Sequence, residues 1–185
     1  MRKIRLTSGM RFIDENQFES GEDHGGHADR LGEIIASLPV FSMLDKDQIK
    51  ELMPLVHLNK YEQGRYLIKE NQAPRMLYFL ISGHVTIIKN NVKLGELRRT
   101  GDIFGEMSFI DEKVRSASVQ AKKETLCLEI DMRGVDLAGM DRHAPFFAVI
   151  YRAFSEILAL RLRKMNDELI YLRSELTRAR AENKR

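Results

Sequence analysis

Residues 104–119 constrain this chain more than any other segment, because a glycine, a carboxylate and an arginine stand at short offsets within an apolar frame. Gly105 and Glu106 open a short amphipathic turn. A helix that starts there leaves backbone N–H groups without partners inside the helix, and these favour an anion. Arg115 can return across that helix end and hold the same anion through two N–H donors. Glu106 is then left to accept from a neutral hydroxyl. The combination predicts a site for a nucleotide monophosphate.

The segment resembles the phosphate-binding cassette of the cyclic nucleotide-binding domain, a family that includes bacterial catabolite activators, protein kinase A regulatory subunits and cyclic-nucleotide-gated channels. The residues that carry the resemblance are Phe104-Gly105-Glu106 and Arg115-Ser116-Ala117. It implies that Glu106 bonds the ribose 2′-hydroxyl and that Arg115 binds the cyclic phosphate. Backbone amides and one hydroxyl would complete the cradle. The implied site residues are Gly105, Glu106, Met107, Ser108, Arg115 and Ser116.

The middle of the chain, from about residue 56 to residue 130, consists of short strand-like runs separated by turn residues. Asn90-Asn91 predicts a tight hairpin, because asparagine accepts the left-handed conformation. Many short strands indicate a sandwich or barrel, and the resemblance sharpens this to an eight-stranded jelly-roll barrel. The fold expected is therefore mainly β with flanking helices. Asn71 stands where the family usually has a glycine, and we expect it to adopt a positive φ.

Two helices are expected before the barrel. Apolar residues recur at helical spacing from Leu31, and Pro39 ends that run. Asp45 and Gln48 have the spacing of a capping box at the start of a second helix.

The N-terminal residues 1–29 are polar and without a sustained period, which predicts a flexible arm. His24 and His27 lie in this arm without a third ligand, so no metal site is predicted. The expected domains are this arm, a cyclic nucleotide-binding barrel with entry helices over 30–140, and a dimerisation helix over 141–185.

Residues 141–185 are long, charged and helical in pattern, and Pro145 is expected in the first helical turn. A first apolar stripe is spaced to lie against a globular body: Phe147, Ile150, Phe154 and Ile157. A second stripe alternates steps of four and three: Leu158, Leu162, Met165, Leu169, Leu172, Leu176 and Ala179. This heptad pattern predicts a parallel coiled-coil dimer. The alternative is one amphipathic helix folded back on its own domain.

The base of the nucleotide has two candidate contacts on this helix. Laying the chain on the bacterial activators without gaps puts Arg161 and Asn166 where their helix meets the base. Asn166 offers a donor and an acceptor, and Arg161 can supplement the phosphate contact or stack on the ring. The alternative is that both are solvated flanks of the coil. Cyclic AMP is favoured over cyclic GMP, although a hydroxyl at Ser116 suits either ligand.

Composition argues against several other functions. The formal charge of +3 comes from 30 basic and 27 acidic residues, which is no nucleic-acid footprint, and no helix-turn-helix pattern follows the heptads. No apolar run has membrane-spanning length, no catalytic constellation or cofactor motif is visible, and a single Cys127 fits the cytoplasm. We therefore expect a homodimeric cyclic nucleotide sensor that signals to an unidentified protein partner. The alternative is a scaffold that has lost its ligand and acts as a coiled-coil interaction module.

Overall fold

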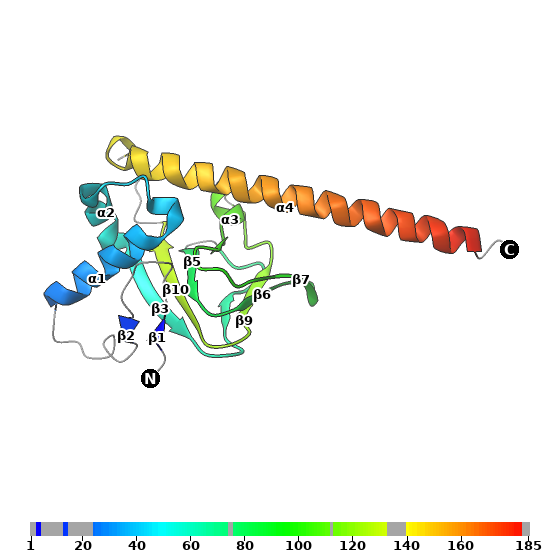
Figure 1. Cartoon of the computed structure of the whole chain (residues 1–185), viewed down its shortest axis with the longest axis horizontal. Coiled ribbons are helices and arrows are strands. Elements are labelled where there is room, and N and C mark those ends of the chain that lie inside the picture. The colour runs from blue at the N-terminus through cyan, green and yellow to red at the C-terminus, as the bar shows by residue number, and fades with distance from the viewer. Residues whose placement is uncertain are drawn as a thin grey trace. The chain divides into compact units, whose positions relative to one another are not determined.

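The structure is a computed structural model of the whole chain (Figure 1). It describes the backbone of residues 3–4, 13–14, 24–73, 76–111, 113–132 and 140–182. Side chains are described for residues 30–73, 76–111, 113–132 and 144–180. The chain divides into two compact units, Met1–Phe146 and Phe147–Arg185, and each is described by itself.

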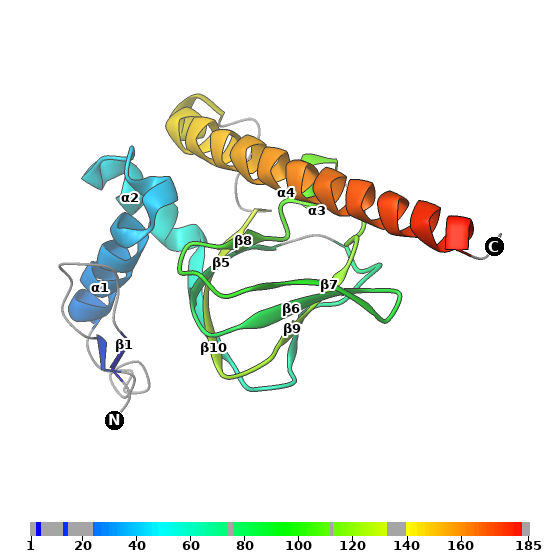
Figure 2. The same ribbon diagram turned by 45° about the vertical axis from the view of Figure 1, so that its right-hand side comes forward.

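The larger unit is built on two four-stranded antiparallel sheets (Figure 2). One sheet has the order β3-β10-β5-β8 and the other the order β4-β9-β6-β7. The strands are β3 (Val56–Tyr61), β4 (Tyr66–Ile68), β5 (Met76–Ser82), β6 (Val85–Lys89), β7 (Val92–Leu97), β8 (Ile103–Phe104), β9 (Ser118–Ala121) and β10 (Thr125–Asp131). Most neighbours in the sheets are not consecutive in the chain, so connections pass between the two sheets. This confirms the predicted eight-stranded jelly roll.

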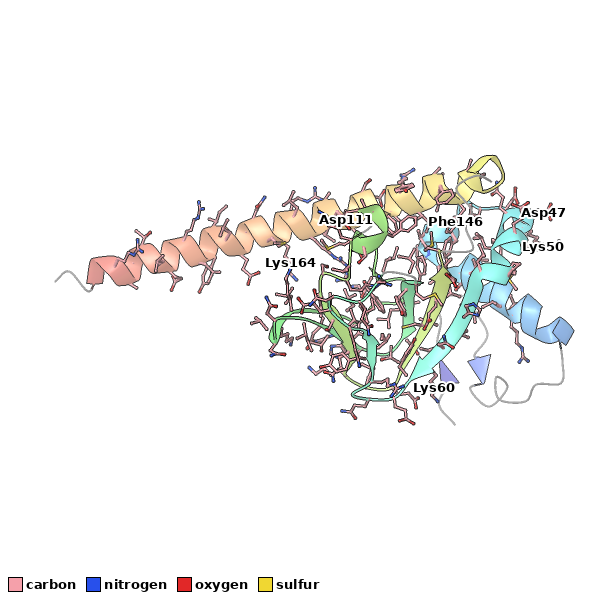
Figure 3. The ribbon with its side chains drawn as sticks, turned by 180° about the vertical axis from the view of Figure 1, so that it is seen from behind. Asp47, Lys50, Lys60, Asp111, Phe146 and Lys164 are labelled. Carbon is pink, nitrogen blue, oxygen red and sulfur yellow. The ribbon has the colours of Figure 1, made fainter. Side chains whose placement is uncertain are left out.

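Side chains from both sheets fill the space between them (Figure 3). β5 supplies alternate residues to this core, Tyr78 and Leu80, and is buried along its whole centre from Leu77 to Ile81. A strand whose two faces are both covered reads as a continuous apolar run, as β5 does. Since β8 pairs with β5, the chain that leaves β8 at Phe104 starts from a firmly packed position.

Tight turns between the strands follow the local sequence. Asn90 and Asn91 have φ of 48° and 62°, and Lys89 pairs with Val92 across them. Such values match the turn that suits the right-handed twist of a hairpin. Asn71, at φ 66°, also has the predicted positive φ.

The helices before the barrel are α1 (His24–Ser37) and α2 (Lys46–Leu52), with one-turn 3₁₀ helices at Pro39–Phe41 and Met53–Leu55. The capping box is confirmed, since the Asp45 carboxylate accepts from the N–H of Gln48 at 2.9 Å and the Gln48 side chain accepts from the N–H of Asp45 at 3.0 Å. On the surface of α2, Asp47 and Lys50 form an ion pair at 3.4 Å (Figure 3).

Two features differ from the expected arm. α1 begins at His24 and not at Leu31, because the apolar periodicity that predicts a helix starts only at Leu31. Two short strands, β1 (Lys3–Ile4) and β2 (Ile13–Asp14), pair within the arm. The other residues before His24 lie outside the described part of the chain.

The C-terminal helix, α4, runs from Met140 to Glu182. Pro145 lies inside this helix, so its predicted place in the first turn was wrong. The helix starts earlier than that placement assumed, and the proline removes only one hydrogen bond near the helix start. In the described part of the chain, no helix is both long and apolar enough to cross a membrane.

The two predicted stripes of α4 differ in exposure. Phe147, Ile150 and Phe154 of the first stripe are buried, and Ile157 is half-buried. Side chains of the second stripe are 47–66% exposed at Leu162, Met165, Leu169, Leu172 and Leu176.

Candidate functional site

The site begins where β8 ends and the chain turns into the short helix α3 (Met107–Ile110). Gly105 makes the turn with a φ of +86°. Glu106 is the N-cap of α3, and its carbonyl accepts from the N–H groups of Phe109 at 3.0 Å and Ile110 at 3.1 Å. The helix therefore starts at Met107, two residues later than predicted. The N–H groups of Met107 and Ser108 belong to the first turn, and the N–H groups of a first turn have no acceptor within their own helix.

Arg115 packs beneath this turn and is only 5% exposed. Its Nη1 donates to the carbonyl of Gly105 at 2.8 Å, and its Nη2 donates to the carbonyl of Met76 at 2.5 Å. A Cβ on residue 105 would lie 2.6 Å from this Nη1 and 3.2 Å from the Met76 oxygen. The guanidinium thus occupies the space that any side chain at position 105 would need.

The backbone of Arg115 is held by the loop between β4 and β5. The N–H of Asn71 donates to the carbonyl of Arg115, and the N–H of Arg115 donates to the carbonyl of Gln72, each at 2.9 Å. This reciprocal pair holds the backbone of Arg115 against the loop. Asn71 can take part because it adopts a positive φ, which most residues avoid.

An aromatic pair lies beside the guanidinium. The rings of Tyr78 and Phe104 stack at 5.0 Å with 7° between their planes. The Cζ of Arg115 lies 6.0 Å from the centre of the Tyr78 ring, within range of a cation–π contact. The Tyr78 hydroxyl donates to the carbonyl of Leu67 at 3.1 Å. Sequence reasoning missed this pair, because an aromatic residue in a buried strand usually serves the core alone.

The site holds two charged side chains out of water, since Glu106 is 1% exposed and Arg115 is nearly as buried. Burial lowers the pKa of Arg115, while Tyr78 and Glu106 act in the opposite direction. Burial also raises the pKa of Tyr78 to about 12, helped by the nearby Glu129 and opposed by Arg115. A guanidinium stays charged in proteins, so the site offers a fixed cation with a carboxylate close by.

The structure brings together six predicted residues, which are Gly105, Glu106, Met107, Ser108, Arg115 and Ser116. The Ser116 hydroxyl donates to the sulfur of Met107 at 3.6 Å, so the residue after Arg115 contacts the first residue of α3. Arg161 and Asn166 lie on α4 in the other compact unit, where Arg161 is half-buried and Asn166 is exposed. Their contact with a base stays a prediction.

A second buried acid, Glu129 on β10, was not predicted as part of any polar cluster. It is 3% exposed and accepts a hydrogen bond from the Tyr61 hydroxyl. Burial raises the pKa of Glu129, although Tyr61, Asn59 and His57 act in the opposite direction. Within the described residues, no group of three or more His, Cys, Asp or Glu side chains could hold a metal ion.

Residues 58–136 match the family model of the cyclic nucleotide-binding domain. This part of the chain belongs to the cyclic nucleotide-binding domain family. The match includes the whole segment from Gly105 to Ser116, so the predicted family is confirmed at the residues that suggested it. It leaves out α1 and α2 before the barrel, and α4 after it.

Two relatives show how far the similarity to cyclic nucleotide-binding proteins extends. The chain is 30% identical over 148 residues to the cyclic AMP receptor protein of Thermus thermophilus, covering 77% of this chain and 65% of that protein. It is 30% identical over 89 residues to the cAMP-dependent protein kinase regulatory subunit of Schizosaccharomyces pombe, covering 48% of this chain and 22% of that subunit. The chain thus corresponds to only part of the length of these relatives.

Solved structures agree with the fold. The crystal structure of Thermus thermophilus catabolite activator protein superposes with a TM-score of 0.57 at 28% identity, covering 72% of this chain and 62% of that chain. A putative cyclic nucleotide-binding protein from Geobacter metallireducens superposes with a TM-score of 0.59 at 22% identity, covering 73% of this chain and 97% of that chain. At that identity, the second structure supports the fold alone.

Proposed function

We propose that this domain binds a cyclic mononucleotide, with cyclic AMP preferred over cyclic GMP. The observation that carries the proposal is the buried Arg115 locked against the Gly105 turn, with Glu106 beside it. A guanidinium has five N–H donors, and the carbonyls of Gly105 and Met76 each accept from one of its terminal nitrogens. In this proposal the remaining N–H donors of Arg115 bind the phosphate of the nucleotide. A buried guanidinium attracts such an anion strongly, because little water screens the two charges.

The other residues of the site have complementary roles. Glu106 accepts from the ribose 2′-hydroxyl, while the first N–H groups of α3 and the Ser116 hydroxyl surround the phosphate. The preference for cyclic AMP rests on the likeness to the cyclic AMP receptor protein, which the alignment follows over 77% of this chain. Cyclic GMP is the second candidate, because relatives also include a cGMP-dependent protein kinase of Plasmodium berghei.

The signal leaves the domain through α4. In this proposal two copies of the chain pair along α4, Arg161 and Asn166 contact the base, and the paired helices act on a protein partner. The chain works by binding and not by catalysis, and it does so in the cytoplasm without contacting DNA.

The test is a calorimetric titration with cyclic AMP, cyclic GMP and 5′-AMP, repeated with Arg115→Leu. Each hydrogen bond to a charged group contributes about 1.5–3 kcal/mol, so losing two should weaken cyclic AMP binding at least about a hundredfold. Arg99→Leu removes an exposed arginine of the same domain and is the matched control. We expect it to bind as the wild type does.

Arg115→Leu also leaves the Gly105 and Met76 carbonyls without these donors, so thermal unfolding is measured in parallel. If that variant does not fold, Arg115→Lys is the alternative. Lysine keeps the positive charge but cannot form two parallel N–H bonds to one phosphate, so cyclic AMP binding should still weaken. Wild-type protein that gives no binding heat with either cyclic nucleotide would favour the ligand-free scaffold. Equal affinity for 5′-AMP would contradict recognition of the cyclic phosphate.

A further inference from the structure

The turn between β4 and β5 spans residues 69–72 and lies against the segment that carries Arg115. The N–H of Gln72 donates to the carbonyl of Lys69 at 3.4 Å, which closes the turn. Asn71 is the third residue of the turn, and its φ of 66° lets the chain reverse tightly there. The shape of this turn is therefore fixed, and its other polar groups bond to neighbouring parts of the domain.

Three successive residues of this turn are hydrogen-bonded to the segment that follows α3. Asn71 and Gln72 form the reciprocal pair with the backbone of Arg115. The N–H of Glu70 donates to the Ser118 hydroxyl at 2.9 Å. Ser118 begins β9, so one turn holds both Arg115 and the start of the strand that follows it.

The Glu70 side chain connects the turn to a third part of the domain. Its Oε2 accepts from the backbone N–H of Asn90 at 3.1 Å. Asn90 is the first loop residue of the β6–β7 hairpin, in which Lys89 pairs with Val92. The closing bonds of such a loop belong to the flanking residues, so the hairpin itself supplies no acceptor for this N–H. Glu70 is half-buried and supplies one, and a carboxylate accepts a stronger bond than a neutral group does.

The three parts also contact one another through the sheet. β9 runs beside β6, and Ser118 pairs with Ile88, two residues before Asn90 (Figure 2). The backbone of Glu70 thus bonds to the start of β9, while its carboxylate bonds to the loop that follows β6. Removing the carboxylate would release the turn from the hairpin and leave the pairing of β6 with β9 intact.

We infer that Glu70 is a positioning residue for nucleotide binding. Its carboxylate fixes the turn to the hairpin, and the turn holds the backbone of Arg115. From that backbone the guanidinium reaches the Gly105 carbonyl. Glu70 therefore acts through Arg115 and not on the ligand. The inference rests on the proposed function and adds to it a residue from another turn.

The first test follows the Arg115 backbone by NMR amide exchange, without any nucleotide. The N–H of Arg115 donates to the Gln72 carbonyl, and Glu70→Ala should speed its exchange about fivefold, as expected for one lost hydrogen bond. Glu70→Gln keeps an oxygen that can accept from Asn90, so it should restore most of the protection. Glu62→Ala removes an exposed carboxylate from the turn after β3 and is the matched control. We expect wild-type exchange in that variant.

A reference amide in the core separates this effect from a general loss of stability. Leu80 is fully buried, and its N–H donates to the Asp102 carbonyl at 2.8 Å. If Glu70 were purely structural, Glu70→Ala would speed exchange at Leu80 and at Arg115 by the same factor. The inference requires a larger change at Arg115.

The second test measures cyclic AMP affinity by calorimetry. Glu70→Ala should weaken binding about fivefold, with recovery in Glu70→Gln and no change in Glu62→Ala. In the Arg115→Lys background, Glu70→Ala should cost less than about twofold. Lysine binds a phosphate as a point charge, so it depends less on exact placement. Equal losses in the two backgrounds would mean that Glu70 acts independently of Arg115, which would overturn the inference.

The outcomes distinguish this inference from the proposed function. If Glu70→Ala changed neither the exchange of Arg115 nor the affinity for cyclic AMP, the inference would be wrong and the proposed function would stand. If the exchange responded as expected but the wild type bound neither cyclic nucleotide, the proposed function would be wrong. The role in binding that we assign to Glu70 would then be wrong with it.

Discussion

Gly105 and the guanidinium of Arg115 compete for one small space. The Gly105 φ of +86° already disfavours other residues, and the nearest atom to an added Cβ would be Nη1 of Arg115 at 2.6 Å. Two separate costs are therefore joined at one position. The first is backbone strain, which affects folding. The second is displacement of the arginine, which would weaken the proposed nucleotide binding.

Gly105→Ala and Gly64→Ala should differ in their affinity for cyclic AMP. Gly64 has nearly the same φ, +85°, but an added Cβ there meets no atom within 4 Å. Both variants should lose about 1–2 kcal/mol of stability from the left-handed backbone. Only Gly105→Ala should also weaken cyclic AMP binding, by roughly tenfold or more, because a charge-assisted bond is misplaced. Chemical denaturation and calorimetry measure the two effects, and equal affinities in the two variants would contradict the shared space.

At the level of the strands, β10 carries a carboxyl group between two tyrosine-bearing strands. Glu129 pairs across the sheet with His57 on β3 and with Tyr78 on β5, and it accepts from the Tyr61 hydroxyl. Burial raises its pKa above the ordinary value, more than its hydrogen bonds lower it. The folded chain therefore holds this proton to higher pH than the unfolded chain does. Stability from this group falls as pH rises from the unfolded pKa through the folded one.

Glu129→Gln should become more stable relative to the wild type as pH rises from 4.5 to 8. The amide keeps an acceptor for the Tyr61 hydroxyl and cannot ionise, so the variant avoids burying a charge. Urea midpoints of both proteins at several pH values measure the difference. Glu62→Gln, at an exposed carboxylate in the turn after β3, is the control and should show no such trend. If the difference in unfolding free energy between Glu129→Gln and the wild type did not change with pH, Glu129 would have the same pKa in the folded and unfolded states, which would contradict this prediction.

Sequence reasoning succeeded where one residue determines a local conformation. The Asp45 capping box, the Asn90-Asn91 hairpin and the positive φ of Asn71 all depend on the chemistry of short segments. The grouping of Glu106 with Arg115 succeeded because both lie in one short segment. The number of strands and the roles of the site residues came from the resemblance to the family and not from these local signals.

It failed where partners come from distant strands or from the backbone. The Met76 carbonyl that accepts from Arg115 and the Gln72 carbonyl that accepts from its N–H have no sequence signature, because every residue has a carbonyl. The contact of Tyr61 with Glu129 spans 68 positions in the chain. Pro145 was misplaced since helix patterns locate buried turns and not the true start of a helix.

For the molecule as a whole, the proposed sensor must couple the nucleotide-binding domain to α4. Most of α4 belongs to the second compact unit, Phe147–Arg185, and the domain belongs to the first. A ligand shifts an equilibrium only through its different affinity for the two states. In the proposed function, a nucleotide bound by both Arg115 and Asn166 supplies that difference. Without a contact from α4, binding would fill the site and leave the helix unchanged.

Amide exchange along residues 158–169 should therefore slow at saturating cyclic AMP. The effect should be much smaller in Asn166→Ala, even when the site is filled. Ser174→Ala, an exposed change two turns further along α4, is the control and should exchange as the wild type does. Hydrogen exchange measured by mass spectrometry gives the result. Unchanged wild-type exchange at saturation would leave a binding domain without a switch.

The occupied space at residue 105 also sets an order in which relatives of this chain can diverge. While Arg115 keeps its Nη1 against the turn, every side chain at position 105 meets it, so in the proposed function such a change would weaken nucleotide binding and be selected against. Once a lineage has lost the arginine, the nearest neighbours of an added Cβ are the Met76 oxygen at 3.2 Å and Cδ1 of Ile68 at 3.4 Å, so a residue that accepts positive φ, such as asparagine, would need only small shifts around it. In relatives that no longer bind a nucleotide, we therefore expect that the arginine at position 115 was replaced first and the glycine at position 105 afterwards. A relative with a side chain at position 105 should thus also lack the arginine.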